Sequence, residues 1–349
     1  MKTSQPRILI IYTGGTIGMI DNPQTGVLEP FDFTHLIDNV PKIKMLNYEI
    51  DNISFDPPID SSDVNPGHWV QIVRAIESNY HDYDGFVVLH GTDTMAYTAS
   101  ALSFMLENLR KPVIITGSQL PIGEVRTDGE ENLITALQIA AERTPDGDEP
   151  MVQEVAILFE NYLWRGNRAT KRSADNFNAF KSHNYPELAK IGLGINYHEE
   201  ALLRHTHGDE VALKAHCSLD TGVMVVDLFP GITEQILRHQ LSTPGVKGIV
   251  LRTFGAGNAP TARWFTNAVR DAVDRGIVVM NVTQCVNGSV MRRYAAGDAL
   301  AATGVLSGSD ITTEAALTKM MFLFGAGLSD RDVRSQLVRS LRGEVTVGR

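Results

Sequence analysis

The strongest constraint on the fold is the stretch from Ile8 to Gly18, in which an apolar run ends at paired glycines. The five apolar or aromatic residues from Ile8 to Tyr12 indicate a strand buried in a parallel sheet. Gly14 and Gly15 then allow a sharp turn and the close approach of another group. Thr16 follows at the carboxyl end of the strand, where open α/β sheets bind ligands. The stretch alone is compatible with an active site and equally with a glycine turn whose threonine bonds its own backbone.

The alternation of apolar runs with helical spacing predicts an α/β fold along the whole chain. Three further buried strands are indicated in the first half, at residues 86–89, 113–116 and 155–159. Such alternation is typical of a mainly parallel sheet flanked by helices, with right-handed crossovers. The last third repeats the pattern on a smaller scale. We therefore expect a larger N-terminal α/β domain at 1–190, a linker at 191–218 and a smaller C-terminal α/β domain at 219–349.

Composition argues against several classes of protein. The formal net charge of −10 lacks the basic footprint that nucleic-acid binding needs. Two distant cysteines, Cys217 and Cys285, support neither a disulfide framework nor a cysteine-based zinc site. No segment approaches a membrane span, and the N-terminal apolar run is shorter than a signal-peptide core. We expect a cytoplasmic protein without nucleic-acid or membrane partners.

Known nucleotide and metal motifs are absent from the sequence. No Walker loop or HExxH pair occurs, and the Gly255-Ala256-Gly257 turn lacks the third glycine of the dinucleotide fingerprint. A metal site at His205-Thr206-His207, near Glu199 and Glu200, is conceivable, but a solvated loop is the favoured interpretation. We expect neither a cofactor nor a metal.

Hydroxyl and carboxylate side chains gather at the expected strand ends. The group comprises Thr16, Asp60, Ser61, Ser62, Thr92, Asp93 and Ser118. A hydroxyl nucleophile needs a base to take its proton and donors to hold the oxyanion. Glycine-turn amides after Thr16 could supply the donors, and Lys171, if buried, could supply the base.

Each of these residues also has a purely structural interpretation. Asp93 and Thr94 could cap the next helix, Asp60 and Ser61 could order a loop, and Lys171 could lie in water. Spacing alone favours the structural interpretation for Lys171 and Ser61. For Thr16 and Asp93, spacing does not decide between the structural and the functional interpretation.

Two motifs resemble the signatures of the bacterial-type L-asparaginases. They are Thr13-Gly14-Gly15-Thr16-Ile17-Gly18 and His90-Gly91-Thr92-Asp93-Thr94-Met95. The match continues through residues 60–63, 113–118, 165–171 and 283–285, so it covers nearly the whole chain. The stretch from Tyr97 to Leu109 and the missing signal peptide resemble the cytoplasmic type I group rather than the secreted type II group.

The resemblance implies hydrolysis of L-asparagine to L-aspartate and ammonia without cofactor or metal. By this resemblance Thr16 attacks the side-chain amide carbon, and a β-aspartyl ester forms before water cleaves it. Thr92, Asp93 and Lys171 match the triad in which lysine and threonine pass a proton. Asp60 and Ser61 match the family residues that bind the α-amino and α-carboxylate groups of the substrate, and Ser62 is adjacent to them. Asp93 also matches a residue that helps to bind the α-amino group.

One position departs from the family pattern. The family carries a tyrosine on the loop after the first motif, which closes over the nucleophile and helps to activate it. Val27 stands at that place here, and Tyr12 precedes the motif and does not replace it. Either Lys171 and Thr92 carry activation alone, or another group enters when the loop closes.

The type I resemblance also implies a second, allosteric asparagine site. Its pattern is matched by Arg252, Asn258, Thr283, Gln284 and Cys285, with Thr170 linking it to Lys171. The alternative for Cys285 is an ordinary buried thiol. A functional second site predicts sigmoidal kinetics. The family further implies a homodimer or homotetramer.

Two other functions are compatible with these motifs. One is the ammonia-releasing subunit of a transfer-RNA-dependent amidotransferase; the acidic charge and a start directly at the first strand argue against it. The other is a non-catalytic asparagine sensor, which only Val27 favours. The preference for asparagine over glutamine stays open, because one methylene changes discrimination by only ~1–3 kcal/mol.

Overall fold

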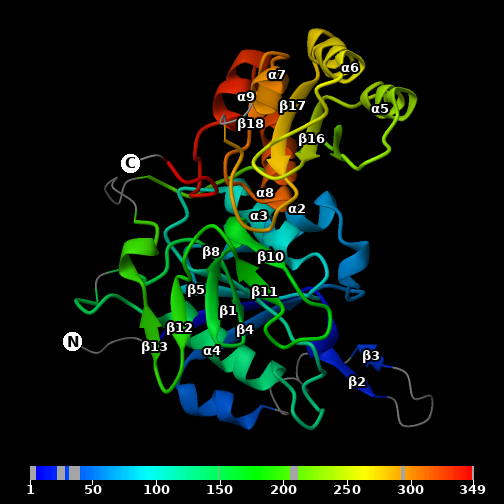
Figure 1. The fold of residues 1–349 in the computed structure, drawn as a ribbon. Helices are drawn as coiled ribbons and strands as arrows, with labels where there is room; N and C mark the ends of the chain where they lie inside the picture. The colour runs from blue at the N-terminus through cyan, green and yellow to red at the C-terminus, as the bar shows by residue number, and fades with distance from the viewer. Residues whose placement is uncertain are drawn as a thin grey trace. The chain divides into compact units, whose positions relative to one another are not determined.

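The chain forms two compact units, shown as a ribbon in Figure 1. The computed structural model describes residues 5–21, 28–30, 40–147, 149–204, 211–291 and 295–347. The first unit contains residues 1–182 and 186–217, and the second contains 183–185 and 218–349. The α/β class and the division into a larger and a smaller sheet confirm the expectation from sequence.

The first unit is built around an eight-stranded sheet whose strand order is β13-β12-β9-β8-β7-β5-β1-β4. The strands β8, β7, β5, β1 and β4 are parallel, whereas β9, β12 and β13 run antiparallel to their neighbours. Their bounds are β1 Arg7–Tyr12, β4 Glu49–Ser54, β5 Gly85–Leu89, β7 Val113–Thr116, β8 Val155–Phe159, β9 Tyr162–Arg165, β12 Ala189–Ile191 and β13 Ile195–Tyr197. Every residue of β5, β7 and β8 is buried, as the apolar runs predict.

Helices cover both faces of this sheet (Figure 1). The helices α2 Pro66–Asn79 and α3 Met95–Met105 lie on one side, and α4 Gly129–Ala141 lies on the other. The connections β5-α3-β7 and β7-α4-β8 advance in the same direction along the sheet but use opposite faces. They therefore have opposite hands, and the expectation of right-handed crossovers fails for one of them.

Local signals set the helix boundaries. Asn65 caps α2, its side chain accepting from Gly67 N, and Pro66 occupies the first turn. The helix α3 ends at Met105, because Leu106–Glu107 forms β6 and pairs with β14, Lys214–Ala215.

The expected linker at 191–218 is largely part of the first unit. In it, β13 pairs with β12, and β14, Lys214–Ala215, pairs with β6. These strands are two or three residues long and only partly buried, so they leave little alternation in the sequence. The remaining short elements of the unit are η1 Thr16–Gly18, β2 Met19–Asp21, β3 Leu28–Pro30, η2 Pro41–Leu46, η3 Ser61–Asp63, η4 Gly166–Arg168, β10 Ala169–Lys171, β11 Phe180–Ser182 and η5 Glu199–Ala201.

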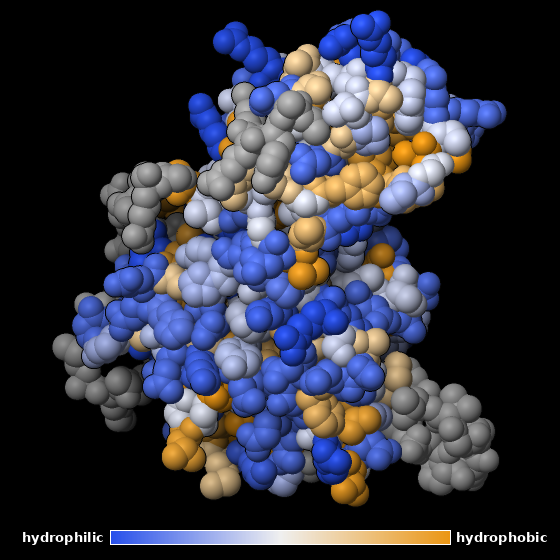
Figure 2. Space-filling model, viewed as in Figure 1, coloured by the Kyte–Doolittle hydropathy of each residue, from blue (hydrophilic) through white to orange (hydrophobic). Residues whose placement is uncertain are grey.

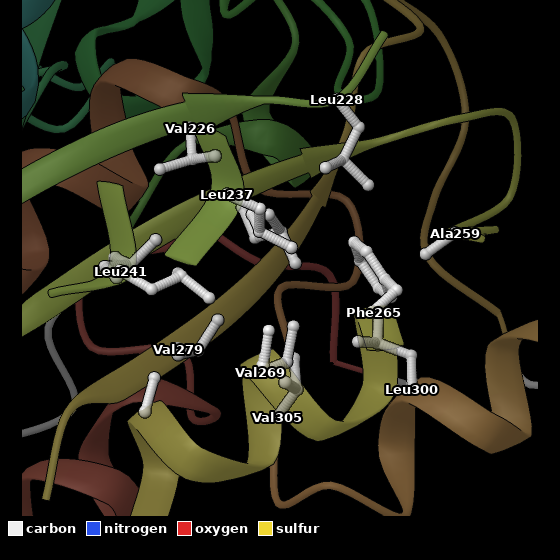
Figure 3. Close-up of a cluster of buried hydrophobic side chains, with 14 of the residues drawn as sticks. Val226, Leu228, Leu237, Leu241, Ala259, Phe265, Val269, Val279, Leu300 and Val305 are labelled. Atoms are coloured by element: carbon white, nitrogen blue, oxygen red, sulfur yellow. The ribbon is translucent and has the colours of Figure 1, made fainter. Parts of the chain in front are cut away.

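The second unit contains a parallel four-stranded sheet, in the order β15-β16-β17-β18. Its elements are β15 Val223–Asp227, α5 Glu234–Leu241, β16 Gly248–Thr253, α6 Arg263–Asp274, β17 Val278–Thr283, α7 Ala295–Ala301, β18 Leu306–Ser307, α8 Thr313–Gly325 and α9 Asp330–Leu337. Leu237, Phe265 and Val269 pack against Leu251 and Val279 in its core (Figure 3). Apolar burial of this kind is the main stabilising contribution to the unit.

A buried ion pair fastens the C-terminal segment to α8. Lys319 and Glu344 are both fully buried, with Nζ 2.6 Å from Glu344 Oε1. Lys319 Nζ also donates to the Leu337 carbonyl at 2.9 Å, and Glu344 accepts from the backbone N–H of Leu341 and Arg342. Burial lowers the pKa of Lys319.

Replacing Lys319 by methionine is expected to lower the free energy of unfolding by about 3–5 kcal/mol. The carboxylate of Glu344 would stay buried without its counter-charge, which is the costly way to break such a pair. Urea unfolding measures the change. Lys247→Met is the matched control, since the Lys247 side chain is 60% exposed in its pair with Asp220 and the pair should be worth under about 1 kcal/mol. Equal losses in the two variants would contradict the account.

The face drawn in Figure 2 is mainly hydrophilic, with hydrophobic residues in scattered patches. In the part of the chain that the structure describes, none of the helices combines the length and the apolar character that crossing a bilayer requires.

Candidate functional site

Three loops meet at the carboxyl ends of the adjacent strands β4, β1 and β5. The loop after β1 accepts a hydrogen bond at the Thr13 carbonyl from Ile59 N, at 2.8 Å. Thr13 donates through its backbone N–H and its Oγ1 to the Leu89 carbonyl, at 3.0 and 2.9 Å. The loop with Thr16 is therefore tied on one side to the segment with Asp60 and on the other to the segment with Thr92.

Glycines allow these loops to touch. Gly15 has φ 92°, and a Cβ on it would lie 2.5 Å from the backbone nitrogen of Gly91. A Cβ on Gly14 would lie 2.2 Å from the Ile59 carbonyl oxygen, and one on Gly91 would lie 2.6 Å from Ser61 Oγ. Only glycine fits at such contacts. The close approach that the paired glycines predict is thus made by the backbone of the second threonine motif.

Tyr12 supports the turn that contains Thr16. Thr16 begins η1, and the buried Tyr12 hydroxyl donates to the Gly18 carbonyl at the end of that turn, at 3.1 Å. The ring fills the space beside Gly18, where a Cβ would lie 2.1 Å from the hydroxyl oxygen. Burial raises the pKa of Tyr12 to about 12, so its hydroxyl is a neutral donor near pH 7.

Replacing Tyr12 by phenylalanine is expected to cost about 1–3 kcal/mol of unfolding free energy, because the Gly18 carbonyl loses a buried donor. Tyr83→Phe is the control, since its hydroxyl donates to Asp51 at an exposed site and should cost within about 0.5 kcal/mol. Urea denaturation of both variants measures the difference. A Tyr12 variant as stable as wild type would show that this hydrogen bond does not hold the turn.

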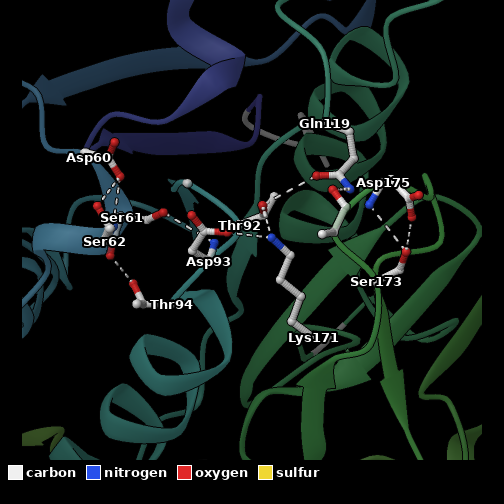
Figure 4. Close-up of polar contacts among 12 residues, drawn as sticks. Asp60, Ser61, Ser62, Thr92, Asp93, Thr94, Gln119, Lys171, Ser173 and Asp175 are labelled. Carbon is white, nitrogen blue, oxygen red and sulfur yellow. Dashed lines mark hydrogen bonds and ion pairs between the residues drawn. The ribbon is translucent and has the colours of Figure 1, made fainter.

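Lys171 lies beside Thr92 and Asp93 (Figure 4). Its Nζ donates to Thr92 Oγ1 at 2.8 Å and is 2.7 Å from Asp93 Oδ1. The Lys171 side chain is 18% exposed, whereas that of Asp93 is 64% exposed. The strand β10 places the lysine there through its pairing with β11. The solvated position that spacing alone favours for Lys171 is therefore wrong.

Ser61 connects the loop after β4 with the loop after β5. Its Oγ accepts from Asp93 N at 3.3 Å, and its carbonyl accepts from Thr94 Oγ1 at 2.6 Å. Thr94 is the N-cap residue of α3, but its side chain makes no capping bond, so the capping interpretation fails for its hydroxyl. Asp60 accepts from the backbone N–H and the hydroxyl of Ser62, at 2.8 and 2.9 Å. These bonds hold the pKa of the Asp60 carboxyl below its usual value, and the group is anionic near pH 7.

Gln119 is a residue that sequence reasoning missed. Its Oε1 lies 3.5 Å from Thr92 Oγ1, and its Nε2 donates to the Asn176 carbonyl at 3.1 Å. The Gln119 backbone N–H donates to the Asp128 carboxylate, and Asp128, the N-cap residue of α4, makes no side-chain capping bond. Ser118 instead donates to the Leu120 carbonyl. The sequence offered a signal for Gln119, because it directly follows Ser118, one of the polar residues that lie at the expected strand ends.

The candidate allosteric residues of the second unit lie at the ends of β16 and β17. Gln284 Nε2 donates to the carbonyls of Leu228 and Arg252, at 2.6 and 2.9 Å. Thr283 Oγ1 donates to the Gly255 carbonyl and accepts from Cys285 N. The other contacts are an ion pair of Arg252 with Asp227 at 2.9 Å and a backbone bridge between Phe254 and Asn258.

The exposure of Cys285 corrects one alternative. Cys285 is exposed, so the interpretation as an ordinary buried thiol is wrong. The chain turns outward after β17, where Thr283 Oγ1 accepts from the cysteine's backbone. Thr170, the proposed link, lies in β10 of the first unit beside Lys171.

Two sequence-based hypotheses fall on residues outside the described part of the chain. They concern Val27 and the conceivable metal site at His205–His207. Among the described residues, no three histidine, cysteine, aspartate or glutamate side chains are grouped so as to hold a metal ion.

Two family models together match most of the chain. The family model "Asparaginase, N-terminal" matches residues 7–203, and "Glutaminase/Asparaginase C-terminal domain" matches residues 222–337. L-asparaginase 1 of Escherichia coli K12 is 44% identical over 97% of this chain and 98% of its own length. A mouse protein named 60 kDa lysophospholipase is 40% identical over 98% of this chain and 63% of its own length.

A solved structure shares the fold across both units. The crystal structure of L-asparaginase I from Vibrio cholerae superimposes with a TM-score of 0.87 at 40% identity, covering 99% of this chain and all of that one. Matching family models, full-length sequence identity and a shared fold lead to one conclusion. The chain belongs to the asparaginase family, within its bacterial type I group.

Proposed function

We propose that the protein hydrolyses L-asparagine to L-aspartate and ammonia, with Thr16 as the nucleophile. The observation that carries the proposal is the position of Lys171 Nζ, 2.8 Å from Thr92 Oγ1 and 2.7 Å from Asp93 Oδ1. Thr92 and Asp93 follow directly on Gly91, whose backbone packs against Gly15 beside the proposed nucleophile. These contacts support the general pattern of covalent catalysis, in which a hydroxyl nucleophile works with a separate proton carrier.

The reaction divides into acylation and deacylation. Thr16 Oγ1 attacks the side-chain amide carbon of asparagine and passes its proton to Thr92 Oγ1, while Thr92 passes its own proton to Lys171 Nζ, which enters this step as the neutral amine. The C–N bond breaks, the leaving nitrogen takes the proton back from Lys171 through Thr92, and ammonia departs from a β-aspartyl ester on Thr16. Water then attacks the ester carbon, passes a proton back through the same pair to Thr16, and releases aspartate. Backbone N–H groups of the turn around Gly15 are suited to stabilise the oxyanion in both steps.

The charges around the site suit a small amino acid. Asp60 and Asp93 are carboxylates at one edge, and either can accept hydrogen bonds from an α-ammonium group. The Ser61 hydroxyl can donate to an α-carboxylate, and the Ser62 hydroxyl can do so when it turns away from Asp60, to which it donates in this structure. A zwitterion needs both kinds of partner, and the loop after β4 provides both within three residues.

The two alternative functions have less support. Identity of 44% to an L-asparaginase over nearly the full chain favours a free-standing amidohydrolase over the subunit of an amidotransferase. A non-catalytic sensor would not need Lys171 directed at Thr92.

The finer features are part of the proposal. We propose an allosteric asparagine site in the second unit at Arg252, Asn258, Thr283, Gln284 and Cys285, linked through Thr170. We also propose assembly as a homodimer or homotetramer and a cytoplasmic location. The support for these is the type I resemblance in sequence.

Ammonia release from L-asparagine and, separately, from L-glutamine tests the function. The proposal predicts turnover of asparagine by the purified protein, with a sigmoidal dependence on concentration if the second site operates. Folded protein that binds asparagine without releasing ammonia would overturn the enzymatic function and leave the sensor.

A further inference from the structure

His90 is a buried histidine next to the site that the proposed mechanism does not use. It follows β5 directly, its backbone N–H donates to the Thr116 carbonyl, and its side chain is 1% exposed. Ring Nδ1 lies 2.6 Å from the Gly91 carbonyl oxygen. Ring Nε2 lies 2.9 Å from Thr98 Oγ1, which in turn lies 3.0 Å from the indole nitrogen of Trp69.

These contacts assign every proton in the chain of hydrogen bonds. A carbonyl oxygen only accepts, so His90 Nδ1 carries the hydrogen. Burial lowers the pKa of His90 to about 4, so the ring is neutral near pH 7 and Nε2 is an acceptor. Thr98 therefore donates to Nε2 and accepts from the Trp69 N–H. The direction of the bonds runs from Trp69 through Thr98 and His90 to Gly91.

Gly91 is the residue that most needs such a restraint. Its backbone contacts Gly15 beside the nucleophile, and its Cα faces Ser61 Oγ. Glycine has no side chain to restrict its φ and ψ angles. The peptide that follows Gly91 is therefore not fixed by the residue itself. Because that peptide is planar, the Gly91 carbonyl and the Thr92 N–H point in opposite directions and turn together. A bond to the carbonyl thus sets the backbone from which Thr92 extends.

We propose that His90 is a positioning residue: its Nδ1–H bond to the Gly91 carbonyl fixes the Gly91–Thr92 peptide and holds Thr92 Oγ1 in line with Lys171. The inference rests on the proposed function for its catalytic consequence, and on geometry alone for the restraint. His90 contacts neither substrate nor the reacting atoms in this account. Its effect on rate is exerted through Thr92.

Two substitutions separate the two ring nitrogens. In His90→Asn the amide nitrogen can occupy the place of Nδ1 and still donate to Gly91, while the bond to Thr98 is lost. In His90→Gln the amide oxygen can occupy the place of Nε2 and accept from Thr98, while the donor to Gly91 is lost. Each variant removes one bond from a buried site, so comparable losses of stability are expected.

The inference predicts that His90→Asn keeps kcat within a few-fold of wild type. His90→Gln is expected to lose about 10- to 100-fold in kcat with little change in KM, since a misplaced Thr92 impairs proton transfer rather than binding. Thr98→Val is the control, because it disturbs the far end of the chain and leaves the Gly91 bond in place. Equal losses of kcat in the Asn and Gln variants, or none in either, would overturn the inference.

Crystal structures of both variants test the restraint independently of turnover. A Gly91–Thr92 peptide that rotates in His90→Gln and stays in place in His90→Asn supports the inference even if asparagine proves not to be the substrate. An unmoved peptide in both variants overturns it. Should neither variant fold, nitrogen-15 NMR of the wild-type histidines decides, since a hydrogen on Nε2 instead of Nδ1 would contradict the assignment.

Discussion

Replacing Thr16 by alanine is expected to abolish asparagine hydrolysis, with kcat reduced by a factor on the order of 10⁴ or more. The variant lacks the oxygen that forms the β-aspartyl ester, and the other two residues of η1, Ile17 and Gly18, carry no hydroxyl. Residual activity would come only from the binding groups and oxyanion donors. Ammonia release at saturating asparagine measures the loss.

Two controls make the Thr16 result specific. Thr16→Ser keeps a hydroxyl and is expected to retain much of the activity. Thr243→Ala removes a hydroxyl from an exposed turn of the second unit and is expected to leave kcat unchanged. A folded Thr16→Ala protein that hydrolyses asparagine at the wild-type rate would show that another group is the nucleophile.

Replacing Lys171 by methionine is expected to lower kcat by about 10³- to 10⁴-fold. The change removes the group that exchanges a proton with Thr92 Oγ1 across 2.8 Å, and general acid–base partners contribute roughly 10²- to 10⁴-fold. It also leaves Asp93 without its cation, at a carboxylate exposed enough to be tolerated. Steady-state kinetics with asparagine, together with a melting curve, separates loss of activity from loss of fold.

The arginine variant at the same position distinguishes charge from proton transfer. Lys171→Arg keeps a cation near Asp93, but a guanidinium does not give up its proton in proteins. We expect it to be about as inactive as Lys171→Met. Lys190→Met, at an exposed position of β12, is the matched control and should be fully active. An active arginine variant would mean that Lys171 acts only through its charge.

Local signals predicted the parts of the fold that depend on neighbouring residues. The run from Ile8 to Tyr12 is a buried strand because both of its faces are covered, and no polar residue interrupts it. Asn65-Pro66 begins α2 and Thr312 caps α8, since a cap needs only the adjacent backbone. The paired glycines predicted a close approach without naming the segment that approaches.

Contacts between distant residues could not be predicted in the same way. Lys171 and Thr92 are 79 residues apart, and spacing alone placed the lysine in water. It is the antiparallel pairing of β10 with β11 that brings it to the rim. Gln119 escaped notice because its role depends on Asn176, on a separate loop. The strands β12 and β13 are too short to show a period in the sequence.

The central claim is that Thr16 carries the aspartyl group during turnover, and a rapid acid quench tests it most directly. Protein mixed with excess asparagine is quenched within one turnover and digested, and the masses of its peptides are measured by mass spectrometry. The account predicts that the peptide containing Thr16 gains the mass of one aspartyl residue, that Thr16→Ala shows no such gain, and that slowing hydrolysis increases the amount. An aspartyl group found on a different residue of the active wild-type protein would contradict it.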